Sequence, residues 1–85
     1  MSISFRFLSS CWKHGLTREE IEECFADTRK LVKKSRDGSY LVLGKTGSGK
    51  ILEIAFRRER ADMIVVFHAM AAKTSDQRMY RRRGK

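Results

Sequence analysis

Residues 44–56 read GKTGSGKILEIAF, and this stretch decides between a nucleotide-binding parallel sheet and an antiparallel hairpin. Its first seven residues match most of the phosphate-binding loop pattern G-x-x-x-x-G-K-[ST], with Gly44, Gly49 and Lys50 at the fixed glycine and lysine positions. The next position does not match, because Ile51 stands where a Ser or Thr hydroxyl would ligate magnesium. The sequence of this loop alone therefore describes a segment that could bind phosphate but would lack the side-chain contact to magnesium.

The residues that follow this loop alternate like a strand, with Leu52, Ile54 and Phe56 on one face and Glu53 on the other. A phosphate-binding loop leads instead into a helix, whose N-terminus holds the phosphate. We therefore interpret KTGSGK, residues 45–50, as a hairpin turn in which glycine accepts the positive φ angles. We expect no nucleotide triphosphate to bind there.

Chain length and net charge limit the classes of function that we expect for this protein. The chain has 85 residues, 41% of them apolar, which suits one small domain over residues 1–85. The net charge of +9, from 19 Lys and Arg against 10 Asp and Glu, predicts an anionic partner, usually nucleic acid and alternatively an acidic protein. No apolar run approaches the roughly 18 residues that cross a bilayer, and no signal peptide is recognisable, so we expect a cytoplasmic protein without a membrane partner.

Two helices are expected near the N-terminus. The spacing of Leu8, Cys11 and Trp12 predicts a short first helix. Thr17 and Glu20 form a capping box that predicts the start of a second helix, LTREEIEECFAD. The first helix and the capped helix thus precede every predicted long strand.

The rest of the chain is predicted to be a sheet followed by one helix. Strand patterns occupy residues 31–32 (a weak edge strand), 39–44, 51–56 and 63–69, and a capped helix with a basic tail occupies 74–83. The predicted fold class is α+β, with two N-terminal helices, a three- to four-stranded antiparallel sheet and a C-terminal helix. Cys11 and Cys24 are interpreted as buried free thiols. Because no C-x-x-C or H-x-x-x-H spacing occurs, we expect no metal and no cofactor.

Several side chains could cleave RNA without a metal. Such cleavage needs a base for the 2′-hydroxyl, cations for the charged phosphorane and an acid for the leaving oxygen. The candidate catalytic residues are Lys13, His14, Glu59 and His68. The candidate RNA-binding residues are Arg57, Arg58, Arg60, Tyr80, Arg81 and Arg82. Structural interpretations remain open: His14 as a helix cap, His68 as a partly buried imidazole and the RRER segment as a solvated turn.

A known family has a similar sequence near its start. KHGLTREEIEECFAD, residues 13–27, resembles the K-H-G-[VL]-[ST]-x-E-E-[AI]-x-E-x-F signature of BrnT-like toxins. The resemblance continues through the strand order, the glycine-rich hairpin after LVLG and a terminal helix bearing tyrosine. Position by position, Lys13, His14 and Gly15 match K-H-G, and Glu59 with Arg60 matches the E-R before the third long strand.

This resemblance implies a function. The family has a RelE-like ribonuclease fold and is the toxin half of bacterial type II toxin–antitoxin pairs. The implied activity is an endoribonuclease that inhibits growth by cutting RNA. The implied partner is a cognate antitoxin, typically with a ribbon-helix-helix DNA-binding part.

The end of the third long strand departs from the family. Members read something like S-A-R-R-A there, whereas residues 68–72 read HAMAA, so two arginines that usually lie against RNA are absent. Two interpretations follow. Either the imidazole of His68 serves as acid or base in place of an arginine, or the chain is a non-catalytic basic module that binds RNA or protein.

Overall fold

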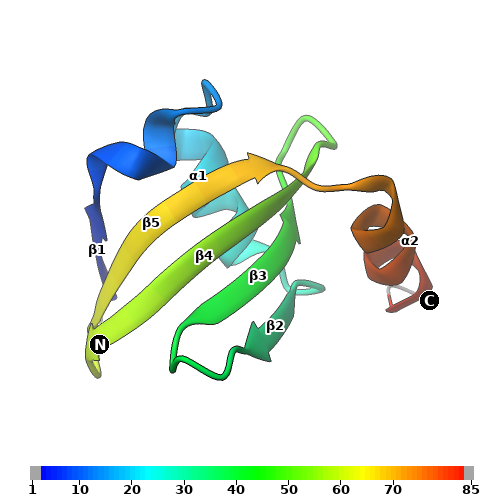
Figure 1. The fold of residues 1–85 in the computed structure, drawn as a ribbon. Coiled ribbons are helices and arrows are strands. Elements are labelled where there is room, and N and C mark those ends of the chain that lie inside the picture. Colours follow the sequence, from blue (N-terminus) through cyan, green and yellow to red (C-terminus); the bar gives the residue numbers. More distant parts are fainter. Residues whose placement is uncertain (1–2, 84–85) are drawn as a thin grey trace.

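A five-stranded sheet organises the fold in this computed structural model, which describes residues 3–83 (Figure 1). The strands are β1 (Ser4–Phe7), β2 (Leu31–Lys34), β3 (Tyr40–Lys45), β4 (Ile51–Arg60) and β5 (Met63–Ala71). The helical segments are the 3-10 turn η1 (Ser9–Trp12) and the α-helices α1 (Arg18–Ala26) and α2 (Thr74–Arg83). The spatial order is β1-β5-β4-β3-β2, in which β1 runs parallel to β5 and the other neighbours are antiparallel.

This architecture corrects the fold predicted from the sequence. The α+β class holds, but the two N-terminal helices and the all-antiparallel sheet of three or four strands were wrong. A strand, a single 3-10 turn and one α-helix stand in place of the two helices. The spacing of Leu8, Cys11 and Trp12 is satisfied by that one turn, in which Cys11 N–H donates to the Leu8 carbonyl at 3.0 Å.

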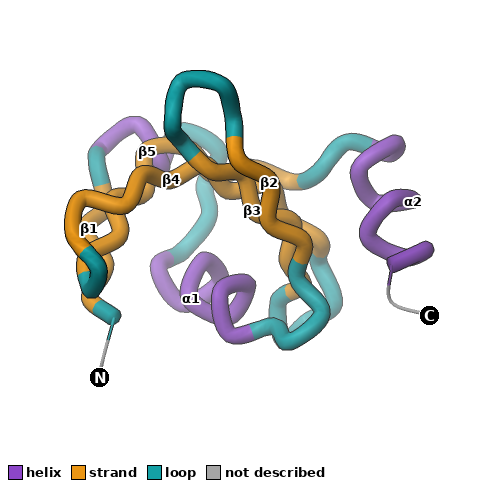
Figure 2. Tube along the Cα trace, turned by 90° about the horizontal axis from the view of Figure 1, so that it is seen from below, coloured by secondary structure: helices purple, strands orange, loops and turns teal. Residues whose placement is uncertain are grey.

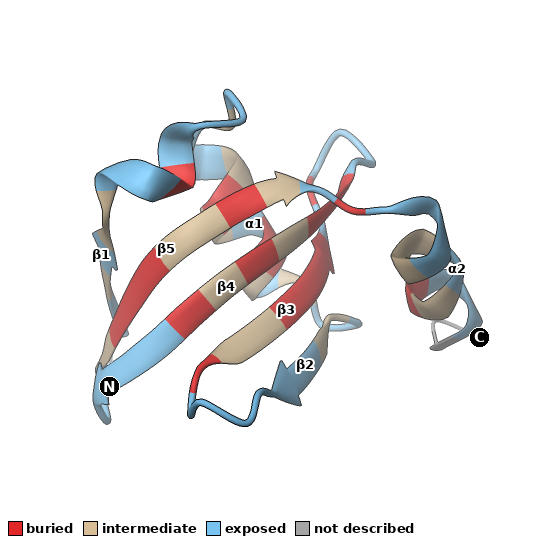
Figure 3. Ribbon diagram, viewed as in Figure 1, coloured by how far each residue is buried: buried red, intermediate tan, exposed pale blue. Residues whose placement is uncertain are grey.

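One face of the sheet packs against α1 and η1. Figure 2 shows the sheet arching over α1, with α2 lying beyond β3 and β2. The predicted alternation of β4 is confirmed, since Leu52, Ile54 and Phe56 all join the core on this face. Buried and less buried residues accordingly alternate along β4 from Leu52 to Phe56 (Figure 3). The predicted capping box of Thr17 and Glu20 is also present and begins α1.

The closest approach of α1 to the sheet occurs at Gly44 in β3. A Cβ atom on Gly44 would lie 2.7 Å from the carbonyl oxygen of Cys24 and 2.8 Å from its Cβ. Only glycine therefore allows the helix to pack this closely. Cys24 and Cys11 are free and fully buried, as predicted. Burial is the main cause that raises the pKa of Cys24 to about 12, so its thiol stays protonated.

The opposite face of the sheet is covered only in part. There the buried ring of Tyr80 from α2 packs with Leu43 and Ile51. Nearer β5 most side chains of this face stay partly exposed, although Val65, opposite Arg57, is buried, and we call this area the open face. It carries the β4 and β5 residues that alternate with the core positions: Glu53, Ala55, Arg57, His68 and Met70.

Candidate functional site

Three side chains from distant segments meet at the open face. The His68 Nε2 atom lies 3.3 Å from Oε2 of Glu53, across from β5 to β4. The ring of His14, which follows η1, meets the His68 ring edge-on with 5.9 Å between centroids. We call His14, Glu53 and His68 the histidine cluster. It unites both predicted catalytic histidines with a carboxylate.

A β-bulge aims His68 at this face. Val66 is fully buried toward α1, so strict alternation would turn His68 toward α1 as well. The strand pairing shifts instead, with Phe56 opposite Val66 and Ala55 opposite His68, which leaves Phe67 as the extra residue. The sequence pattern alone gave no sign of this shift.

The segment that carries His14 is attached to the same bulge. The Ser10 hydroxyl in η1 donates a 2.6 Å hydrogen bond to the carbonyl oxygen of Phe67. This bond holds η1 along the edge of β5 beyond the point where β1 stops pairing, at Val66. The bulge thus positions both imidazoles, one directly and the other through η1.

The direction of the hydrogen bond between His68 and Glu53 depends on the tautomer of the imidazole. In the tautomer that carries its proton on Nε2, His68 donates to the carboxylate of Glu53. In a neutral ring the other nitrogen, Nδ1, then bears a lone pair that can accept a proton. The His68 side chain is 33% exposed, against 14% for Glu53, so the imidazole reaches solvent while the carboxylate behind it is sheltered.

Of the other two predicted catalytic residues, one lies next to the histidine cluster and one lies apart from it. Lys13 directly precedes His14 and is exposed beside the cluster. Glu59 is not part of the cluster, because it pairs with Arg6 of β1 at 3.6 Å. The carboxylate of the site is Glu53, which the outward alternation of ILEIAF could have indicated.

The predicted RNA-binding arginines of β4 point to different faces. Arg57 lies on the open face, with its guanidinium carbon 5.5 Å from the centroid of the Phe67 ring. Arg58 lies on the α1 face and donates to the Ala61 carbonyl at 2.8 Å. Arg60 is exposed at the end of β4. Of these three cations, Arg57 is the one that shares a face with the histidine cluster.

The predicted residues of α2 lie apart from the cluster. Tyr80 is 6% exposed, so its ring has no free face on which a base could stack. Arg81 and Arg82 are exposed on the same helix. Figure 1 places α2 at the opposite edge of the sheet from η1, the turn that precedes His14. These arginines therefore act at a distance from the cluster if they contact RNA.

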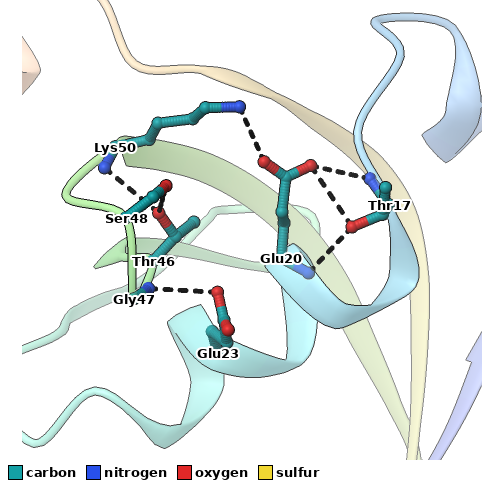
Figure 4. A network of polar contacts seen from close by, with 7 residues as sticks. All are labelled: Thr17, Glu20, Glu23, Thr46, Gly47, Ser48 and Lys50. Atoms are coloured by element: carbon teal, nitrogen blue, oxygen red, sulfur yellow. Dashed lines mark hydrogen bonds and ion pairs between the residues drawn. The ribbon is translucent and has the colours of Figure 1, made fainter.

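The segment that resembled a phosphate-binding loop is an antiparallel hairpin fastened to α1 (Figure 4). Lys50 Nζ pairs with Oε2 of Glu20 at 2.7 Å, and the Gly47 N–H donates to Oε1 of Glu23 at 3.0 Å. Gly49 has a φ of 95°, as the hairpin interpretation requires. Two donors that could have held a phosphate, the Lys50 ammonium and the Gly47 N–H, are therefore bonded to carboxylates of the protein itself.

Substituting Lys50 with alanine should have little effect on stability. Its side chain is 58% exposed, and exposed ion pairs contribute about 0.5 kcal/mol. We expect a small decrease in Tm and no increase in Tm on adding MgATP to either protein, measured by thermal unfolding. Lys45→Ala is the matched control, since it removes the other lysine side chain of the hairpin and keeps the Lys45 N–H that donates to Asp27. An ATP-dependent increase that disappears in Lys50→Ala would contradict the hairpin interpretation.

Asp27, which caps the end of α1, joins that helix to α2. It accepts hydrogen bonds from the Tyr80 hydroxyl at 2.5 Å and from the Lys45 N–H at 2.9 Å. Burial raises the pKa of Asp27, but the hydrogen bonds from Tyr80 and from the Arg29 and Lys45 N–H groups outweigh it and lower the pKa overall. Burial, followed by the bond to Asp27, raises the pKa of Tyr80 to about 12. The contact therefore persists at neutral pH.

Substituting Tyr80 with phenylalanine should cost about 1.5 kcal/mol at neutral pH, because it removes a bond to a charged acceptor. Since folding lowers the pKa of Asp27, this stabilisation is complete above the ordinary value of 3.8 and is lost as the pH falls through the lowered pKa. The difference from wild type should therefore shrink in acid, as measured by urea unfolding. Tyr40→Phe is the control. Equal stability of Tyr80→Phe and wild type at neutral pH would refute the prediction.

In the comparisons with known proteins, the chain matches no family model and no curated protein. Within residues 3–83, no helix is long and apolar enough to cross a membrane. Over the same range, no group of three His, Cys, Asp or Glu side chains is arranged to hold a metal ion. The histidine cluster and its surroundings are therefore the features from which we infer a function.

Proposed function

We propose that the protein is a metal-independent endoribonuclease and acts in the bacterial cytoplasm as the toxin of a type II toxin–antitoxin pair. The observation that carries this proposal is the histidine cluster, in which two imidazoles share a solvent-accessible face and one is held by a carboxylate. The net charge of +9 favours a polyanionic substrate. The resemblance of residues 13–27 to BrnT-like toxins supports the same activity.

The two imidazoles divide the proton transfers. Nδ1 of His68 takes the proton of the 2′-hydroxyl, and Glu53 stabilises the imidazolium that forms. The 2′-oxygen bonds to phosphorus, the bond to the 5′-oxygen breaks, and protonated His14 supplies the proton that the leaving oxygen needs. The products are a 2′,3′-cyclic phosphate and a 5′-hydroxyl. The neighbouring cations, Lys13 and Arg57, stabilise the charge on the phosphorane.

The departure from the family at Met70 fits this scheme. Met70 is the cross-strand partner of Glu53. An arginine at that position would have its guanidinium next to the Glu53 carboxylate and would compete for it. With methionine at position 70, no guanidinium competes with His68 for the Glu53 carboxylate. The missing arginine and the histidine–carboxylate pair are therefore coupled features of one site.

Cleavage of a labelled single-stranded RNA in the presence of a chelator tests the activity. We expect cleavage that persists in the chelator and leaves cyclic-phosphate ends. The matching cellular experiment is induced expression in a bacterium, with growth arrest and loss of RNA integrity as the expected result. Intact RNA with a folded protein in both experiments would refute the nuclease.

A non-catalytic RNA-binding module is the second candidate. Arg57 and its contact with Phe67 favour it, because they form a basic surface on the open face that needs no acid or base. Such a module would shift labelled RNA in a gel without cutting it. Binding that is equal in wild type and His68→Ala, with no product in either, would select this candidate.

A cognate antitoxin is the proposed protein partner. The positive charge of the chain complements an acidic surface, and such complementarity accelerates association. A neighbouring reading frame with a ribbon-helix-helix pattern would be the gene to co-express. Restored growth on co-expression, with a complex recovered at equal stoichiometry, is the expected result.

A further inference from the structure

An apolar groove lies on the α1 face of the sheet, where the end of α1 leaves the core uncovered. Its volume is about 260 Å³. Six apolar or aromatic residues and two cations line it: Ile3, Phe25, Val32, Tyr40, Phe56, Ile64, Lys30 and Arg58. The histidine cluster is on the other face, so the apolar groove is a separate surface.

The most exposed apolar side chains of the fold converge on this groove. Within residues 3–83, the exposed large hydrophobic residues are Ile3 at 49%, Trp12 at 38% and Val32 at 51%. Two of these three, Ile3 and Val32, line the groove from opposite edges of the sheet, beside β1 and in β2. Exposed aliphatic residues that gather around a hollow mark an interaction site more strongly than single exposed residues do.

The floor of the groove is preorganised. The Phe56 ring stacks on Tyr40 at 5.2 Å with an interplanar angle of 15°, and it meets the Phe25 ring edge-on at 5.2 Å. Because these rings already cover one another's faces, they offer little platform for stacking a nucleobase. An apolar side chain that fills the hollow is a better fit than RNA.

The rim of the groove is positively charged. Arg58 is held in place by its bond to the Ala61 carbonyl, and Lys34 lies 5.9 Å from the centroid of the Tyr40 ring. Together with Lys30, these residues put three cations around the hollow, and none of its lining residues is acidic. Carboxylates on either side of an apolar anchor would complement this rim.

We propose that the apolar groove binds an acidic peptide segment of a partner protein, with one large apolar side chain inserted between Ile3 and Val32. This surface does not depend on the proposed nuclease activity, because Arg58 and Val32 face away from the histidine cluster. The two surfaces can therefore be occupied at the same time.

A fluorescent peptide with a central phenylalanine flanked by glutamates tests the proposal by anisotropy, and its lysine counterpart serves as the control probe. We expect the acidic peptide to bind and the lysine peptide not to bind. Val32→Glu and Arg58→Glu should each weaken binding by about tenfold, through a lost apolar contact and a reversed charge. Lys33→Glu, on the opposite side of β2, should leave it unchanged. The lysine peptide should gain affinity for Arg58→Glu.

Amide chemical shifts locate the bound peptide. Perturbations confined to the residues that line the groove, at unchanged Tm of each variant, are the expected result. Four outcomes would overturn the proposal: equal binding of the two peptides, no effect of Val32→Glu, displacement of the peptide by RNA, or a homodimer in light scattering that Val32→Glu dissociates.

Discussion

Substituting His68 with alanine is expected to reduce RNA cleavage roughly 10²- to 10⁴-fold, the usual contribution of a general acid or base. The effect should be this large because His68 is the imidazole that Glu53 holds, and no other described side chain donates to that carboxylate. Cleavage of a labelled RNA at saturating protein measures it. RNA affinity should change little, since the substitution removes no cation from the open face.

Two companion measurements separate chemistry from structure. His68→Gln retains an N–H that can donate to Glu53 but cannot take up a proton, so it should be as inactive as the alanine variant. Free imidazole should restore part of the activity of His68→Ala and none of that of His68→Gln, whose side chain fills the space. Undiminished cleavage by His68→Gln would remove His68 from the mechanism.

Substituting Gly44 with alanine is expected to destabilise the fold by about 3 kcal/mol, the upper part of the range for overpacked cores. The added Cβ would meet the backbone oxygen of Cys24 at 2.7 Å, and a helix backbone cannot give way as a flexible side chain does. Urea unfolding followed by circular dichroism measures the loss. α1 would have to move away from β3 to accommodate the methyl group.

Gly47→Ala in the same hairpin is the matched control. The nearest atom to its added Cβ is Oε2 of Glu23 at 3.3 Å, at the end of a flexible side chain. It should cost less than about 1 kcal/mol, the ordinary effect of a surface substitution. Similar losses in the two variants would mean that the approach of α1 at Gly44 does not limit packing.

Local signals explain which parts of the fold could be predicted from the sequence. The capping box at Thr17 and the alternation of β4 involve residues a few positions apart, and both predictions were correct. The strand β1 was missed because its four residues pair in parallel with β5, at the other end of the chain. A short strand whose only partner is so distant leaves no local periodicity.

The candidate site was predictable in part for a similar reason. The chemistry of the imidazole group predicted His14 and His68 as catalytic residues, and the fold brings their rings together. Their carboxylate was assigned to Glu59, whereas Glu53 reaches His68 because of the strand register and the bulge at Phe67. A bulge depends on the pairing of two strands, and one strand's sequence does not reveal it. The burial of Tyr80 could not be predicted, because an amphipathic helix pattern does not show what its aromatic residue packs against.

The hairpin that resembles a phosphate-binding loop discriminates against nucleotides by competition. Glu20 and Glu23 are covalently tethered beside Lys50 and the Gly47 N–H, so their effective concentration there is on the order of millimolar or higher. A nucleotide from solution would have to displace these carboxylates and leave them beside its own negative phosphates. Removing the two carboxylates, rather than adding a Ser or Thr after Lys50, is therefore the first change that would make this turn available to an anion.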